Sequence, residues 1–186
     1  GEAMVRLTTK AKNAQEAEKL ASPVIAQILE RLGKHAYGVD VPNLESVLAG
    51  MLEKAGLTVS FIEAGSGGLA ARRMQGTALA DRVCAPSLSA MEPATLAQCM
   101  DHGEGLPEKP EEACARLADL GSQRLKSPVV VAIRVKDHQT ACAVKTGSGI
   151  RRYAQTLPAR GLEYSQTAAV QAAFDLLRLT LMDEAE

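Results

Sequence analysis

One stretch in the middle of the chain indicates the fold: Leu57-Thr58-Val59-Ser60-Phe61-Ile62, then Glu63-Ala64-Gly65-Ser66-Gly67-Gly68, then Leu69-Ala70-Ala71-Arg72-Arg73-Met74. The first six residues include β-branched and aromatic side chains, which favour a strand. Glycine dominates the next six, as is typical of a tight turn, and the last six favour a helix. The stretch therefore predicts a strand, a turn and a helix in that order.

This turn also has a chemical implication. Glycines let the backbone approach a ligand closely, and the start of a helix presents unpaired N–H groups with a partial positive charge. With the Ser66 hydroxyl and the cations Arg72 and Arg73 nearby, the turn predicts a cradle for one phosphate. The alternative is a purely structural connection, in which Ser66 caps the helix and the arginines are solvated, as also predicted for Arg151 and Arg152. Glu63 is then either a site residue or the partner of an arginine.

Helical patterns lie on both sides of the turn. Before it, Asn43 offers an N-cap, an apolar stripe follows, and Gly56 is placed to end the helix. After it, residues 76–108 show no readable pattern, and the apolar spacing from Pro110 to Leu125 predicts another helix.

The last third of the chain alternates between strand patterns and turns. Val129–Val135, Thr140–Lys145 and Ile150–Leu157 predict an antiparallel meander of three strands, and a final helix is predicted from about Leu162 to Met182. Helices before, between and after strands imply an α/β fold. We therefore predict a three-layer α/β/α sandwich with a mixed sheet for residues 41–186.

Residues 1–40 form a smaller pattern of their own. Met4–Thr9 alternate like a strand, Asn13 caps a helix with apolar residues at helical spacing, and Ala36–Val39 favour a second strand. Pro23 predicts a kink or a break in that helix. We therefore predict a β-α-β fragment that is too small to bury a core alone. Because the chain starts in a strand without an initiator methionine, we expect it to be part of something longer.

Composition excludes several classes of function. With 46% hydrophobic and 23% charged residues over 186 positions, the chain can bury a core and is not disordered. Lys and Arg number 21 against 22 Asp and Glu, so no basic surplus favours a nucleic-acid partner. No apolar run approaches the roughly 20 residues needed to span a bilayer. We therefore expect a cytoplasmic protein with neither a nucleic-acid nor a membrane partner.

Cysteines and histidines do not indicate a metal site. The four cysteines lack metal-knuckle and Cys-x-x-Cys spacing, so reduced core thiols are predicted, with no metal and no cofactor. The three histidines are scattered singly and predict no catalytic role. These residues are Cys84, Cys99, Cys114, Cys142, His35, His102 and His138.

Several stretches together resemble one protein family. The stretch from Leu57 to Arg72 resembles the start of the CinA C-terminal domain, whose turn usually reads Glu-Ser-Cys-Thr-Gly-Gly-Leu-Ile-Ala. Ala169–Leu177 is similar to the last helix of that domain, and Pro93-Ala94-Thr95-Leu96 resembles its Pro-Glu-Thr-Leu element. Residues 4–40 resemble the end of the KH-like middle domain of CinA. The resemblance implies a competence/damage-inducible CinA-type protein, beginning just upstream of its C-terminal domain.

The resemblance also implies a chemistry. The family is a nicotinamide-nucleotide amidase, which hydrolyses nicotinamide mononucleotide (NMN) to nicotinic acid mononucleotide and ammonia. Such a reaction needs a nucleophile, a base and donors for the oxyanion. The family takes these from the Ser and Thr of the turn, a Gly-Ser-Ser, a Tyr-Ser/Thr-Asn-x-x-Lys segment, a Gly-Ile-Ala-Gly-Pro loop and a late Arg.

The present sequence departs from that site. Ala64 replaces the turn Ser, Ala78 replaces the second Ser of Gly-Ser-Ser, and neither has a nucleophilic atom. The Tyr…Lys segment and the Gly-Ile-Ala-Gly-Pro loop have no counterpart. What remains of the site is a set of ligand-binding candidates: Glu63, Gly65, Ser66, Gly67, Gly68, Arg72 and, in place of the late Arg, Arg160.

Two functions follow from these departures. The preferred one is a catalytically degenerate domain that serves as a scaffold, a dimerisation module or a sensor of a mononucleotide ligand, and the resemblance implies a homodimer. The alternative is an active NMN amidohydrolase whose nucleophile has moved to Ser66 or Thr77, with Lys126, Lys136 or Glu63 as the base. A nucleic-acid adaptor is disfavoured, because the KH-like part lacks a Gly-x-x-Gly loop.

Overall fold

The computed structural model describes residues 3–101, 103 and 105–185. The chain divides into two compact units, Gly1–Asp40 and Val41–Glu186. Each unit is described by itself below.

The larger unit is built on one mixed sheet of five strands in the order β2-β1-β3-β4-β5. β1 pairs in parallel with β2 and β3, whereas β3, β4 and β5 form antiparallel pairs. The predicted meander and the mixed sheet are therefore confirmed. The strands are β1 (Val59–Ala64), β2 (Leu88–Ala90), β3 (Val129–Lys136), β4 (Gln139–Thr146) and β5 (Gly149–Thr156).

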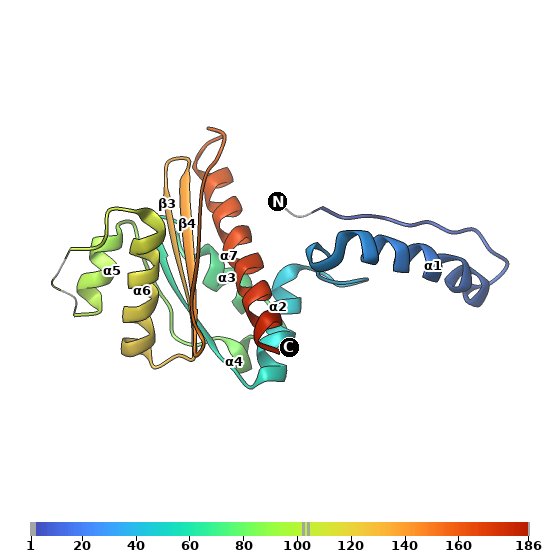
Figure 1. The fold of residues 1–186 in the computed structure, drawn as a ribbon, viewed down its shortest axis with the longest axis horizontal. Coiled ribbons are helices and arrows are strands. Elements are labelled where there is room, and N and C mark those ends of the chain that lie inside the picture. The colour runs from blue at the N-terminus through green and yellow to red at the C-terminus, as the bar shows by residue number, and fades with distance from the viewer. Residues whose placement is uncertain (1–2, 102, 104, 186) are drawn as a thin grey trace. The chain divides into compact units, whose positions relative to one another are not determined.

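Helices cover both faces of this sheet (Figure 1). On one face lie α5 (Pro93–Cys99) and α6 (Pro110–Leu125). On the other lie α2 (Leu44–Ala55), α3 (Leu69–Gln75) and the long α7 (Leu162–Ala185). A short helix, α4 (Ala80–Val83), follows α3. This arrangement confirms the predicted α/β/α sandwich.

The core has two halves, one on each face of the sheet. On the α6 side, Gly121 allows close packing, because a Cβ there would lie only 2.9 Å from a side-chain carbon of Ile62. On the α7 side, the rings of Phe61 and Phe174 are 5.9 Å apart, within the usual range for aromatic pairs. Both rings are at most 1% exposed. All of β1 and most of β3 are buried, as expected for strands covered on both faces, whereas the short edge strand β2 is not.

Local signals in the larger unit fixed the helix ends. Asn43 caps α2 by accepting a hydrogen bond from the Ser46 N–H at 2.9 Å, and Gly56 ends the helix in the left-handed conformation with φ 66°. Both were predicted. The first strand exists but is shifted two residues, from 57–62 to 59–64. The region without a readable pattern contains α4, β2 and α5, which are too short to give a periodic signal.

The smaller unit consists of α1 (Ala14–Leu32) and a 3₁₀ turn, η1 (Gly33–His35), with extended chain on either side. Asn13 caps α1 as predicted. The helix continues through Pro23, so of the predicted kink or break the break is wrong. The strands predicted for 4–9 and 36–39 are not formed, so the β-α-β description of residues 1–40 is wrong for the described part of this unit. A strand needs a hydrogen-bonded neighbour, and alternation alone does not supply one.

Candidate functional site

The Gly-rich turn between β1 and α3 is closed by a carboxylate of the protein itself. Glu63, near the end of β1, is only 1% exposed. Its Oε2 accepts hydrogen bonds from the Ser66 hydroxyl at 2.6 Å and the Ala70 N–H at 3.0 Å. Its Oε1 accepts from the Ala71 N–H at 2.9 Å. A carboxylate thus occupies the electropositive start of α3.

This arrangement bears directly on the phosphate cradle expected from the sequence. The N–H groups of Ala70 and Ala71, which a phosphate would use, already donate to Glu63. Glu63 accepts hydrogen bonds from one hydroxyl and two backbone amides, and no arginine of the described residues is among these donors. The role of helix cap predicted for Ser66 is wrong, because the N-cap position is Gly68 and receives no side-chain hydrogen bond.

Gly65 holds the turn against its neighbours. Its φ of 76° lies in the left-handed region, and a Cβ there would collide with the carbonyl oxygen of Val135. Its N–H donates to the Ala90 carbonyl at 2.9 Å, and its carbonyl accepts from Gln166 Nε2 at 2.8 Å. The turn is therefore bound to β2 and to α7 as well as to α3. Sequence reasoning missed Gln166, since a single glutamine on a helix carries no local signal.

Neither the positions of the family's serines nor the hydroxyls considered as substitutes provide a free nucleophile. Ala64 is fully buried, and Ala78 is exposed beyond α3. Of the two hydroxyls considered as relocated nucleophiles, Ser66 is 2% exposed and donates to Glu63, and Thr77 donates to the Met74 carbonyl at 2.8 Å. The candidate bases Lys126 and Lys136 are exposed.

The arginines near the turn differ in their surroundings. Arg72 is exposed, as the alternative of a solvated charge predicts. That prediction is wrong for Arg73, which forms an ion pair with Glu45, bonds Gln171 Oε1 at 3.2 Å and lies 5.0 Å over the Phe174 ring. Arg73 therefore ties α3 to α2 and α7.

The sequence predicts Arg160 as a ligand-binding residue and Arg151 as a solvated charge. Arg160 is exposed, and its guanidinium lies 5.3 Å over the ring of Tyr164. Arg151 is paired with Asp183 at 2.6 Å, so its charge is partly neutralised within the chain.

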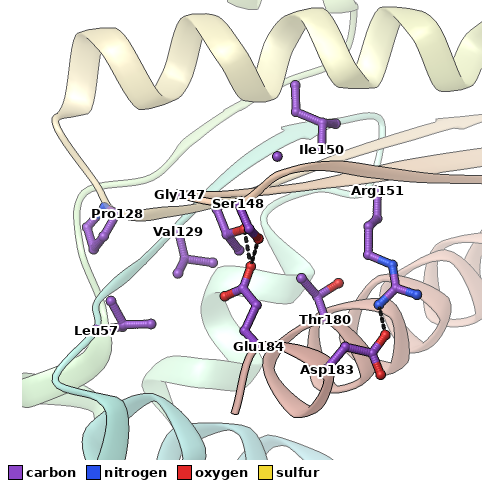
Figure 2. Close-up of a pocket in the computed structure, with 12 residues that line it drawn as sticks. Leu57, Pro128, Val129, Gly147, Ser148, Ile150, Arg151, Thr180, Asp183 and Glu184 are labelled. Atoms are coloured by element: carbon purple, nitrogen blue, oxygen red, sulfur yellow. Dashed lines mark hydrogen bonds and ion pairs between the residues drawn. The ribbon is translucent and has the colours of Figure 1, made fainter. Parts of the chain in front are cut away.

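A separate pocket of about 850 Å³ lies beside the β4–β5 turn and the end of α7 (Figure 2). Leu57, just before β1, and Val129, the first residue of β3, lie on its wall. The pocket is therefore at the end of the sheet where these parallel strands begin, whereas the Gly-rich turn is at the end where β1 stops. Glu184 accepts hydrogen bonds from Thr146 and Ser148 in the pocket. The polar groups of this pocket are thus largely used by one another, and none of the predicted site residues lines it.

The thiols are free and mostly sheltered. Cys114 and Cys142 are buried, and burial raises the pKa of the Cys142 thiol to about 12 and that of Cys114 further. Cys84 is half-buried, and burial raises its pKa too. Cys99 is exposed, so the prediction of a core thiol is wrong at that position, on the outer surface of α5. The raised pKa values keep the thiols of Cys84, Cys114 and Cys142 protonated at neutral pH, so these three are poor nucleophiles.

The described residues lack two kinds of feature. No cluster of three or more His, Cys, Asp or Glu side chains in the described part of the chain is arranged to hold a metal ion. Among the described helices, none combines the length and the apolar character that crossing a membrane requires. His35 and His138 are exposed, and His102 lies outside the described residues.

Parts of the chain are similar to known proteins. Residues 1–38 match the profile of the "Damage-inducible protein CinA KH domain". A CinA-like protein of Kosmotoga olearia is 39% identical over 83 residues, which are 45% of this chain and 20% of that protein. A CinA-like protein of Dictyoglomus turgidum is 42% identical over 74 residues, 40% of this chain and 18% of that protein. The matches thus span about a fifth of the length of these curated relatives.

Solved structures share the fold. The competence/damage-inducible protein CihA of Agrobacterium tumefaciens superposes with a TM-score of 0.65 at 17% identity, over 77% of this chain and 99% of that one. A CinA superfamily protein of Escherichia coli superposes with a TM-score of 0.62 at 14% identity, over 81% of this chain and 98% of that one. The chain therefore shares its fold with these two proteins. It is thus similar to CinA-like proteins in part of its sequence and in its fold, and the resemblance to the CinA family predicted from the sequence is confirmed.

Proposed function

We propose that this chain is a non-catalytic member of the CinA family that acts as a self-associating scaffold. The observation that carries the proposal is the lack of a free nucleophile at the Gly-rich turn, where Ala64 is fully buried and the one hydroxyl, that of Ser66, is 2% exposed and bonded to Glu63. The carboxylate of Glu63 takes the Ser66 hydroxyl and the two amides at the start of α3. Without Glu63, the Ser66 hydroxyl would be free to attack an amide, and the two backbone N–H groups would be free to bind an anion.

The missing reactive atoms support the same proposal. Amide hydrolysis needs a nucleophile and a base, and removing one member of such a pair costs several orders of magnitude in rate. Ala64 and Ala78 stand where the resemblance implies serines. Gly65 also stands where the family has Cys, and its close approach to Val135 leaves no room for a side chain.

Sensing of a mononucleotide is the second form of this proposal. Arg72 is an exposed cation next to the turn. Gly67 and Gly68 have no side chain, so the backbone of the turn is accessible there. A ligand that binds only the folded protein raises its apparent stability. A thermal-shift series with NMN, nicotinic acid mononucleotide and ADP-ribose tests it: no shift with any of the three contradicts sensing.

We place the protein in the cytoplasm as part of the proposal, with no nucleic-acid or membrane partner. Four free cysteines fit a reducing compartment. The balance of 21 basic and 22 acidic residues supports the absence of a nucleic-acid partner.

The decisive experiment is an assay of ammonia release from NMN by the purified chain. We expect no release above the protein-free control. If ammonia is released, Ser66→Ala and Thr77→Ala identify the source, because each removes one hydroxyl and leaves the backbone unchanged. Release that either substitution abolishes establishes the alternative, an amidohydrolase with a relocated nucleophile, and overturns the proposal.

A further inference from the structure

The sheet has one long open edge, formed by β5. This strand has eight residues and only one strand neighbour in the described chain, β4. All of its residues except Gln155 are exposed. The backbone N–H and C=O groups on the outer side of β5 therefore have no strand to pair with. The other edge, β2, has three residues, which is too short to seat a partner strand well.

β5 lacks most of the devices by which proteins protect such an edge. It contains no proline, and its pairing with β4 runs in register from Gly149 to Thr156 without a bulge. Of its two arginines, Arg151 forms an ion pair with Asp183, which partly neutralises its charge. Only Arg152 offers a full charge to whatever approaches.

The arrangement of side chains on β5 favours a second copy of the same strand. Two copies related by a two-fold axis normal to the sheet pair antiparallel, and the residue on the axis faces itself. Only the registers centred on Arg152 or on Tyr153 overlap along nearly the whole strand. The first sets Arg152 against Arg152, and like charges directly opposite are unfavourable. The second sets Tyr153 against Tyr153 and Arg152 against Ala154, so it avoids that clash and gains an aromatic pair.

We propose that two copies of the chain associate through an antiparallel β5–β5 pair centred on Tyr153, which makes the two sheets continuous. Strand addition at an open edge gains backbone hydrogen bonds, and the opposed side chains set the register. This inference specifies the homodimer of the proposed function and rests on it. The interface is isologous, because each contact occurs twice.

The test uses the full chain and a matched pair of substitutions at Ala154, an exposed position opposite Arg152 in this register. Ala154→Glu places a carboxylate against each Arg152, and we expect a dimer dissociation constant roughly threefold to thirtyfold lower by sedimentation. Ala154→Arg creates two like-charge pairs and is expected to raise it by a similar factor. Opposite changes of affinity from two substitutions at one exposed position cannot both arise from misfolding, which keeps the test decisive.

A second pair addresses the centre of the interface. Tyr153→Phe keeps the aromatic contact and is expected to leave dimerisation unchanged, whereas Tyr153→Lys opposes two cations and is expected to weaken it. A parent chain that stays monomeric at high concentration overturns both the homodimer and this interface. A dimer whose affinity responds to none of Ala154→Glu, Ala154→Arg and Tyr153→Lys overturns the β5 interface alone, and assigns self-association to another surface.

Discussion

Two helices of this chain carry the same local signals and have opposite fates. α1 and α2 are both capped by an asparagine that accepts a hydrogen bond at 2.9 Å, and both end at a glycine with positive φ. Both carry an apolar stripe. Yet α2 buries five residues and packs on α7, α4 and α3, whereas none of the residues of α1 is buried. Capping and periodicity therefore specify a helix, and a core forms only where a partner surface is available.

The same contrast holds for the two units. Many large apolar side chains of the first unit remain exposed, for example Leu20 at 56% and Val24 at 40%. In the second unit, apolar side chains at comparable helical spacing, such as Leu48 and Leu52, are 0% exposed. The sandwich supplies two faces of a sheet for its helices to cover, and the smaller unit has no sheet in its described residues.

The largest expected effect comes from matched leucines in these two helices. We expect Leu48→Ala in α2 to lower the free energy of unfolding by about 2–5 kcal/mol, because it leaves a cavity in a packed core. Leu20→Ala in α1 is expected to change it by less than about 0.5 kcal/mol, as is usual for exposed positions. Urea unfolding followed by circular dichroism measures both. Equal losses would mean that α1 belongs to the cooperative core, and the contrast would fail.

The sequence was sufficient for elements whose signal is local. Pro110–Leu125 was predicted to the residue, and the three strands of the meander were placed within one or two residues. Their apolar patterns are long enough to be periodic, and their turns are marked by glycine or polar residues. β2 was missed because three residues show no alternation, and its pairing with β1 crosses more than twenty positions of sequence. The strands expected in the smaller unit failed for a related reason: alternation does not show whether a partner strand exists.

The site was less predictable than the fold, because its geometry depends on contacts between distant residues. The spacing of Glu63 and Ala70 gave no sign that this carboxylate would take the amides at the start of α3. The bond from Gln166 to Gly65 spans 101 positions of sequence, and the ion pair of Arg73 with Glu45 spans 28. What the sequence could supply was the list of residue types in the turn and the absence of serines at positions 64 and 78.

An intermediate effect is expected at the carboxylate that closes the turn. Glu63→Gln keeps the size of the side chain, but its amide nitrogen cannot accept a hydrogen bond, so at least one donor loses its partner. We expect a loss of about 1–3 kcal/mol in the free energy of unfolding, the usual cost of a buried unpaired polar group. The matched control is Glu53→Gln, which affects an ion pair with the exposed Arg82 and is expected to change stability within experimental error. Similar losses for both would show that Glu63 does not hold the turn together.

The smallest effect is expected from removing residues 1–40 altogether. The buried apolar residues of the chain all lie from Leu44 onward, and none of the described residues before Val41 is buried. Residues 41–186 alone should therefore unfold with a midpoint within about 2 °C of the parent, since 1 kcal/mol corresponds to roughly 2–8 °C for domains of this size. Differential scanning calorimetry provides the measurement. A drop of more than about 5 °C would mean that the first unit supports the second in solution, and that its exposed apolar helix has a stabilising contact. Measuring the mass of residues 41–186 in solution gives a second result. If this shortened chain still dimerises, the surface for self-association lies on the sandwich, as a β5–β5 interface requires.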